Sequence, residues 1–346
     1  MKEDMLVPSV EEWKELYEAA VDFKDLRPWL WMVDSDLIGV QNPQDKEIGY
    51  CCIMGQMGQV FALVVYVGSE GLDAYLKIQS GEIDGSDPEF MHTQKCLIAS
   101  FENRGCLEKE DFQIIKKLGL KFRGPNAWPQ FRSYLPGYVP WFLTKNEARF
   151  LTIALKQSMD VALRFRKDKK LLPPPDSRLI MARIPGGKGE KTDWKDVLVE
   201  LPAQGKKEDI LIEPVNELRI ERVKKNLAKR EGIWEVDFFY FPGAVQEGDR
   251  PYFPRTLVIV DHSIGIVLHT WLASPWKFFS EYQEDLLSFI EAKETLPKQI
   301  LVSKHESFTM LAPITSGLNI DLKMVKALRA LEEFKEDMYA HFRGTP

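Results

Sequence analysis

The sequence of 346 residues lacks several features that would assign it to a specialised class of protein. No uninterrupted apolar run reaches the roughly 18 residues of a membrane-spanning helix. The N-terminus is acidic and amphipathic, without the basic start and apolar centre of a signal peptide. With 45% apolar and 28% charged residues, the composition is that of a globular chain rather than a disordered one. We therefore expect a cytoplasmic protein without a membrane partner.

Cysteine is scarce, and the four copies all lie in the first third of the chain, at Cys51, Cys52, Cys96 and Cys106. Neither a C-x-x-C motif nor a Cys/His spacing typical of zinc sites occurs. Cys51 and Cys52 are neighbours in an apolar, strand-like run, so their side chains should point to opposite faces. The sequence predicts buried, inert thiols and no metal site.

One stretch of the first half lacks acidic residues. No Asp or Glu occurs between Phe112 and Asn146, where lysines and arginines alternate with aromatic residues. The candidate ligand or partner surface in this stretch comprises Arg123, Trp128, Arg132, Tyr134, Tyr138 and Trp141. Such a surface can neutralise phosphates and stack bases. The alternative is a proline-rich loop that folds its aromatic side chains onto the core, and we favour it because Trp and Tyr are usually buried.

The charge balance bears on the partner. A net charge of −6 argues against non-specific binding to nucleic acid or to an anionic membrane surface. A basic helix is predicted over 214–230, but its cations alternate with Glu217 and Glu221, which is typical of a solvated face. We expect a protein or a small ligand as the partner rather than nucleic acid.

Two patterns that could signal catalysis are incomplete. The run GGKGEKT, at 186–192, lacks the Gly that a phosphate-binding loop needs directly before Lys-Thr, because Glu190 stands there. His262 and His269 flank a predicted hairpin beside Asp261, but no motif places a Ser or Cys nucleophile with them. We therefore predict structural roles for both histidines.

The predicted elements run through the same order twice. Residues 9–165 read as helix, three strands, helix, strand, helix, strand and helix, and residues 214–342 repeat that order. The clearest break is RFRKDKKLLPPPDS, in which charge gives way to three prolines. We expect an N-terminal α/β domain at 1–170, a linker with a short strand pair at 171–213, and a C-terminal α/β domain at 214–346. Both domains should contain mixed sheets in a βββαβαβα order.

Several long runs resemble a known family. They are WLWMVDSDLIGVQNP, IGYCCIMGQMGQVFALVVYVGSEGL and YLPGYVPWFLTKNEARFLTIAL in the first half, and LPKQILVSKHESFTMLAPITSGLNIDLKMVKALRALEEF in the second. These runs resemble the two domains of a group of bacterial proteins that are classed only as domains of unknown function. The resemblance implies a two-domain, bacterial, cytosolic protein. It implies no activity and no functional residues.

The element order is also similar to the ribonuclease-H-like fold, whose nuclease and integrase members hold two metal ions between carboxylates. If both halves adopt it, the chain is a degenerate duplication of that fold. This resemblance implies acidic side chains that converge near the first strand, the end of the fourth strand and the last helix. The candidates in the second half are Asp237 on the first strand and Glu332 or Glu333 on the last helix. After the fourth strand, residues 303–306 read Ser-Lys-His-Glu instead of offering Asp, so the set is incomplete.

The preferred interpretation is a non-catalytic cytosolic binding or interaction protein, without a cofactor, a catalytic residue or a metal ligand. The alternative is a divergent metal-dependent nuclease or phosphoryl-transfer enzyme of ribonuclease-H-like topology. That alternative would require Mg²⁺ or Mn²⁺ near Asp237. Neither interpretation assigns a substrate.

Overall fold

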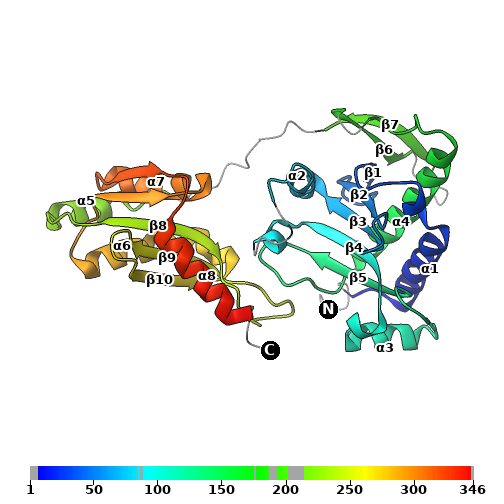
Figure 1. Cartoon of the computed structure of the whole chain (residues 1–346), viewed down its shortest axis with the longest axis horizontal. Helices are drawn as coiled ribbons and strands as arrows, with labels where there is room; N and C mark the ends of the chain where they lie inside the picture. Colours follow the sequence, from blue (N-terminus) through cyan, green and yellow to red (C-terminus); the bar gives the residue numbers. More distant parts are fainter. Residues whose placement is uncertain are drawn as a thin grey trace. The chain divides into compact units, whose positions relative to one another are not determined.

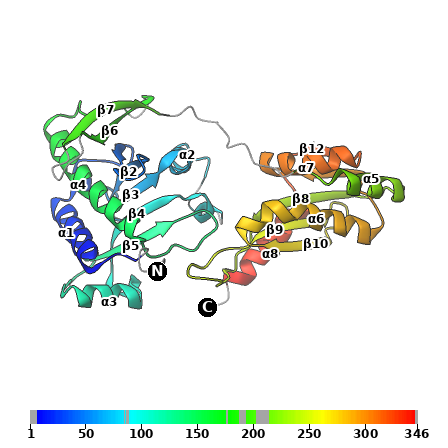
Figure 2. The same cartoon turned by 180° about the vertical axis from the view of Figure 1, so that it is seen from behind.

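The computed structural model describes residues 7–83, 85, 89–174, 177–186, 193–201 and 214–343. The chain folds as two units, of which the first comprises residues 1–136 and 140–204 and the second residues 137–139 and 205–346. Figure 1 colours the chain from its N-terminus to its C-terminus, and Figure 2 shows it from behind. Within the described ranges, no helix combines the length and the apolar character that a membrane span requires.

The first unit contains, in chain order, α1 (Val10–Leu26), β1 (Ile38–Gln41), β2 (Ile48–Met54), β3 (Ala62–Val67), α2 (Gly68–Gln79), β4 (Cys96–Glu102), α3 (Lys109–Lys117), β5 (Trp128–Tyr134), α4 (Lys145–Lys167), β6 (Leu179–Pro185) and β7 (Trp194–Glu200). Local chemistry fixes where the two long helices begin. Ser9 and Glu12 form a reciprocal capping box at the start of α1, and Thr144 and Glu147 form another at the start of α4.

The described strands of the first unit form one sheet in the order β5-β4-β3-β2-β1-β6-β7. Strands β1 to β5 pair with their chain neighbours in antiparallel fashion, and β6 joins β1 in parallel. Gly39 permits that junction, because a Cβ there would lie 2.8 Å from the Cβ of its partner Ala182. The sheet therefore grows along the chain to β5 at one side and is extended by the β6–β7 hairpin at the other.

Helices cover both faces of this sheet. On one face, α1 and α4 bury Leu16, Phe23 and Leu151 in the largest apolar cluster of the unit. On the other face, α2 packs Leu72 and Tyr75 against the sheet. Figures 1 and 2 show α1 and α4 together on one side of the sheet and α2 apart from them. Burial of the apolar faces on both sides gives the unit its own core.

The second unit contains, in chain order, α5 (Glu217–Asn226), β8 (Ile233–Tyr240), β9 (Arg255–Asp261), β10 (Val267–Ala273), α6 (Pro275–Lys293), β11 (Gln299–Val302), α7 (His305–Gly317), β12 (Asp321–Met324) and α8 (Arg329–Arg343). Helices α5, α6 and α7 share one apolar cluster with Trp234, Val236 and Phe238 of β8. Leu331 of α8, together with Leu328 just before the helix, packs on the opposite face, against Phe239.

The described strands of the second unit form a sheet in the order β10-β9-β8-β11-β12. Strands β8, β9 and β10 are antiparallel neighbours, whereas β11 is parallel to β8 and β12 is parallel to β11. Numbered within the unit, the order is third, second, first, fourth and fifth. This is the strand order and direction of the ribonuclease-H-like fold, which the sequence resemblance indicated.

The order of helices and strands repeats along the chain, but the pairing of the strands within the sheets does not. Both units follow the predicted order of helix, three strands, helix, strand, helix, strand and helix, with β6 and β7 added to the first. The two sheets differ in strand order, so the two halves do not both adopt the ribonuclease-H-like fold. In the first unit β4 pairs with β3, whereas its counterpart β11 pairs with β8, the first strand of its own sheet. A degenerate ribonuclease-H-like duplication is therefore contradicted by the first unit.

The strand pair assigned to a linker at 171–213 belongs to the sheet of the first unit, so that assignment is wrong for β6 and β7. Besides the pairing with β1, ion pairs attach the hairpin to α4, since Asp196 of β7 lies 2.5 Å from Arg164 and Arg183 of β6 lies 3.4 Å from Asp160. The salt bridge with Arg164 lowers the pKa of Asp196. Apart from Gly186, the run GGKGEKT lies outside the described residues.

Three of the four cysteines are buried, and Cys106 is exposed, so the prediction of burial is wrong for Cys106. Burial raises the pKa of the Cys51 thiol to about 12, and it also raises the pKa values of Cys52 and Cys96. A thiol that is protonated and shielded from solvent is a poor nucleophile. Cys51, Cys52 and Cys96 therefore act as core residues.

Candidate functional site

Two buried carboxylates on β8 are the most unusual polar feature of the second unit. Glu235 and Asp237 are two residues apart on one strand, so their side chains point to the same face of the sheet. That face is the one covered by α8, to which both carboxylates bond. The residues are 1% and 2% exposed. A carboxylate at such depth is costly unless hydrogen bonds and cations compensate it, so its partners define the site.

Asp237 is held by two lysines. The Nζ atoms of Lys304 and Lys335 lie 3.1 Å and 3.4 Å from the same carboxylate oxygen, Oδ2. The other oxygen, Oδ1, accepts hydrogen bonds from the Ser307 hydroxyl at 3.1 Å and from the Phe238 backbone N–H at 2.9 Å. Both oxygens of this buried carboxylate are thus bonded to donors of the protein itself.

The two lysines that contact Asp237 come from two different elements of the fold. Lys304 lies two residues after the end of β11, the fourth strand of the unit, which runs beside β8. Lys335 comes from α8, the last helix, and its ammonium group also lies over the Phe239 ring. These are the two places where the ribonuclease-H-like resemblance requires further acidic side chains. The structure brings ammonium groups to Asp237 from both of them.

Glu235, the second buried carboxylate, has different partners from Asp237. Its Oε1 lies 2.6 Å from Nδ1 of His262, and its Oε2 accepts the backbone N–H of Leu331, in the first turn of α8, at 2.9 Å. A carboxylate at a helix N-terminus satisfies an orphan donor and interacts favourably with the helix dipole. Glu235 therefore fastens α8 to the sheet and also contacts His262. The other histidine of the predicted hairpin, His269, contacts Asp285 at 2.6 Å.

This donor set does not fit the two metal ions of ribonuclease-H-like enzymes. Two divalent cations need several converging carboxylates to offset their charge. Here the one central carboxylate is already paired with two ammonium groups. Among the described residues, no three His, Cys, Asp or Glu side chains are grouped so that they could hold a metal ion. The residues at Asp237 thus provide cations where the chemistry would need anions.

The candidates on the last helix do not join Asp237 in any contact of the described residues. Glu332 is exposed and accepts the backbone N–H of Leu328 at 3.3 Å, which is a local bond at the start of α8. Glu333 is exposed as well. The residue that does reach Asp237 is Lys335, which the sequence prediction missed. Its signal was its place four residues after Leu331 and three before Met338, on the buried stripe of the helix.

The acid-free stretch of the first unit contains a buried arginine, not a surface cation. Arg132 is 7% exposed and donates to both carboxylate oxygens of Asp111, at 2.9 Å and 2.7 Å. Its guanidinium also lies 4.6 Å from the Phe142 ring centroid. Arg132 therefore ties β5 to α3 and cannot serve a binding surface. Arg123 is exposed.

The four aromatic residues of the candidate surface, Trp128, Tyr134, Tyr138 and Trp141, are half-buried. Trp128 packs against Phe112 and Phe122, with ring centroids 5.9 Å and 5.8 Å apart. Trp141 forms an isolated antiparallel bridge with Ser133 of β5, and burial raises the pKa of Tyr134. The rings close over the core without being wholly removed from solvent. They do not form one platform with Arg132 for stacking bases.

Tyr138 is separate from the rest of the stretch, because residues 137–139 belong to the second unit. It forms an isolated antiparallel bridge with Tyr252, and its ring stacks on Trp276 at 6.3 Å. The guanidinium of Arg250 lies 5.4 Å from its centroid. The predicted surface of six residues is therefore divided between two units, and its members have unrelated partners.

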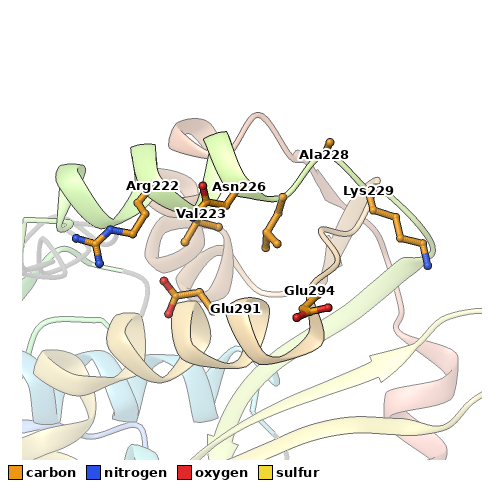
Figure 3. Close-up of a pocket in the computed structure, with 8 residues that line it drawn as sticks. Arg222, Val223, Asn226, Ala228, Lys229, Glu291 and Glu294 are labelled. Carbon is orange, nitrogen blue, oxygen red and sulfur yellow. The ribbon is translucent and has the colours of Figure 1, made fainter.

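A pocket of about 550 Å³ lies between α5 and the end of α6. Figure 3 shows Arg222 and Asn226 on the α5 side and Glu291 and Glu294 on the α6 side. Arg219 crosses between the helices and bonds to Glu291 at 2.6 Å, which lowers the pKa of that carboxyl. The basic helix is thus docked on α6 through an ion pair and is not only a solvated face.

The second unit has the strand order and strand directions of the ribonuclease-H-like fold, and its central carboxylate is paired with lysines. Residues 13–183 match the family model of a domain of unknown function (DUF7309), and residues 219–339 match that of another domain of unknown function (DUF6930). The chain therefore contains both domains, as the resemblance of its sequence to a two-domain family indicated.

Comparison with curated proteins finds no match. One solved structure to which the chain is similar is a crystal structure of a pre-cleavage Mos1 transpososome, at 12% sequence identity and a TM-score of 0.21. The alignment covers 78% of this chain and 72% of that chain. At this level the likeness carries no argument about fold or function.

Proposed function

We propose that this chain is a non-catalytic binding protein, in which the second unit uses a ribonuclease-H-like scaffold without its metal chemistry. One observation carries the proposal: Oδ2 of Asp237 contacts the ammonium groups of both Lys304 and Lys335. A divalent cation at this oxygen would have to displace at least one ammonium group and would stand beside the other. Repulsion between like charges in a poorly hydrated site opposes that.

The same arrangement gives the lysines a structural purpose. Removing a carboxylate from water costs several kcal/mol, which the ammonium groups and two hydrogen bonds offset. Since the ammonium groups are fixed charges of the protein, the site persists without any added ion. It holds β8, the turn after β11 and α8 together. A scaffold that is stable by itself is suited to presenting surfaces to a partner.

A protein or a small ligand is the proposed partner. The burial of Arg132 against Asp111 and the separate placement of Tyr138 support this choice, because both remove members of the surface that could have bound nucleic acid. The proposed setting is the cytosol of a bacterium. Three buried free thiols support the cytosol, since reduced cysteines are usual there. The bacterial origin rests on the family resemblance alone.

The test is a nuclease assay in Mn²⁺ on single-stranded DNA, duplex DNA and an RNA–DNA hybrid. Wild type, Asp237→Asn and Asp321→Asn would be purified in the same way, the last as a control because Asp321 is exposed on β12. The proposal expects the same background cleavage from all three proteins. Cleavage by wild type and Asp321→Asn that disappears in Asp237→Asn would overturn it and favour the metal-dependent alternative.

A further inference from the structure

Strand β10 is an unprotected sheet edge in the second unit. It pairs with β9 on one side, and no described strand pairs with its other side. Edge strands expose backbone donors and acceptors to other chains, and proteins usually blunt them with charges, proline, bulges or short length. From Ser263 to Ser274 there is no Lys, Arg, Asp, Glu or Pro. The imidazole of His269 in this run is turned to Asp285.

The other sheet edges of the described residues are protected. Strand β5 contains Pro129, and the bridge between Trp141 and Ser133 covers part of it. Strand β7 carries Lys195, Asp196 and Glu200, and β12 has only four residues, two of them charged. Strand β10 has a register shift between Val267 and His269, but the five residues from His269 to Ala273 pair regularly with β9.

Apolar side chains are exposed at both ends of this open edge. Ile264 and Ile266, in the hairpin before the strand, are 66% and 57% exposed. Leu272, near its end, is 45% exposed, and Trp276, in the first turn of α6, is 54% exposed. Solitary exposed apolar residues are ordinary, but a run of them beside an unpaired strand marks an interaction surface.

We propose that β10 pairs antiparallel with β10 of a second copy of this chain, which would join the two five-stranded sheets. An uncharged strand meets no like-charge repulsion when it faces itself, which makes it self-complementary. Antiparallel pairing centred at Thr270 or Trp271 brings the hairpin of one copy to the start of α6 in the other. Exposed isoleucine of each copy then lies beside exposed Trp276 of its partner. This inference is independent of the chemistry at Asp237.

The contact is small, because it comprises one short strand and its flanks, so the dimer should be reversible and concentration-dependent. Sedimentation velocity of the full chain, from sub-micromolar to several hundred micromolar, should show a monomer–dimer equilibrium. Leu272→Lys places equal charges near each other at the paired edge and should abolish the dimer. Leu218→Lys is the matched control, since Leu218 is 83% exposed on α5, and it should leave the equilibrium unchanged.

Disulfide trapping tests the pairing itself. Exposed Cys106 would first be replaced by Ser in every protein used. Opposed residues of antiparallel strands have Cα atoms about 4.5–5.5 Å apart, within the reach of a disulfide. Oxidation should cross-link Thr270→Cys to itself if the pairing is centred there, or to Leu272→Cys in a mixture if it is centred at Trp271. A Ser316→Cys control, in the last turn of α7, should remain monomeric.

Three results would overturn the proposal. They are a monomer at every concentration, a dimer that Leu272→Lys does not weaken, and cross-linking at Ser316→Cys in preference to the β10 positions. Circular dichroism of each variant shows whether it is folded. All substituted side chains are exposed, so folding should be retained.

Discussion

Removing both ammonium groups at Asp237 should strongly destabilise the second unit. In Lys304→Met/Lys335→Met the stems remain, but the carboxylate, whose side chain is 4% exposed, has no cation left. Breaking a buried pair in this way costs about 3–5 kcal/mol. The Lys304 side chain is 33% exposed, so Lys304→Met alone should cost about 1 kcal/mol or less.

Adding Asp237→Asn to the double variant tests the cause. The amide oxygen can still accept the hydrogen bonds of Ser307 and Phe238, and no charge remains buried. The triple variant should therefore recover about 2 kcal/mol or more relative to the double variant. Lys298→Met/Lys323→Met, which changes two exposed lysines of the same unit, should stay within about 0.5 kcal/mol of wild type.

The assay is hydrogen–deuterium exchange of β8 and α8 peptides across a urea series, which reports the free energy of opening of the second unit separately from the first. Two outcomes would refute the reasoning. One is a double variant as stable as its exposed-lysine control. The other is a triple variant no more stable than the double.

Three further predictions concern the first unit. Arg132→Met should reduce the free energy of unfolding of the first unit by about 3–5 kcal/mol, because it leaves a buried carboxylate unpaired. Arg123→Met, at an exposed position, should change that free energy by about 0.5 kcal/mol at most. Equal losses of stability in urea unfolding of the two variants would contradict the buried ion pair. Titration of the native protein with a thiol reagent at neutral pH should reveal one fast thiol, absent in Cys106→Ser, and fast labelling of Cys51 would contradict its burial. Fluorescence anisotropy should detect no salt-sensitive binding of single-stranded oligonucleotides at micromolar protein. Such binding, lost in Tyr134→Ala, would restore the nucleic-acid interpretation.

The order of elements was predictable because local signals determine it. The capping boxes at Ser9 and Thr144 and the apolar periodicities depend on residues a few positions apart. The pairing of strands was not predictable in the same way. In the first unit the strand after the helix, β4, pairs with the third strand, β3. In the second unit the corresponding strand, β11, pairs with the first strand, β8, although the element order of the two units agrees. Tertiary packing determines which strand the fourth strand of each unit pairs with.

The residues around Asp237 could be predicted only in part, for a similar reason. Asp237 follows from its place on the first strand, and the missing Asp after the fourth strand was visible as Ser303-Lys304-His305-Glu306. Lys335 was missed because a lysine on an amphipathic helix is ordinarily assigned to the solvated face. The role of Arg132 was missed because Asp111 lies 21 residues away on another element. An ion pair between residues so far apart in the sequence produces no periodic pattern from which it could be predicted.

The central claim is that ammonium groups occupy the place of metal ions at Asp237, and equilibrium Mn²⁺ binding tests it most directly. Electron paramagnetic resonance would count free Mn²⁺ in solutions of wild type, of Lys304→Asp/Lys335→Glu and of the same double variant with Asp237→Asn. The account predicts no saturable site in wild type, a saturable site in the double variant where three carboxylates converge, and its weakening by Asp237→Asn. Saturable Mn²⁺ binding by wild type that Asp237→Asn abolishes would contradict it.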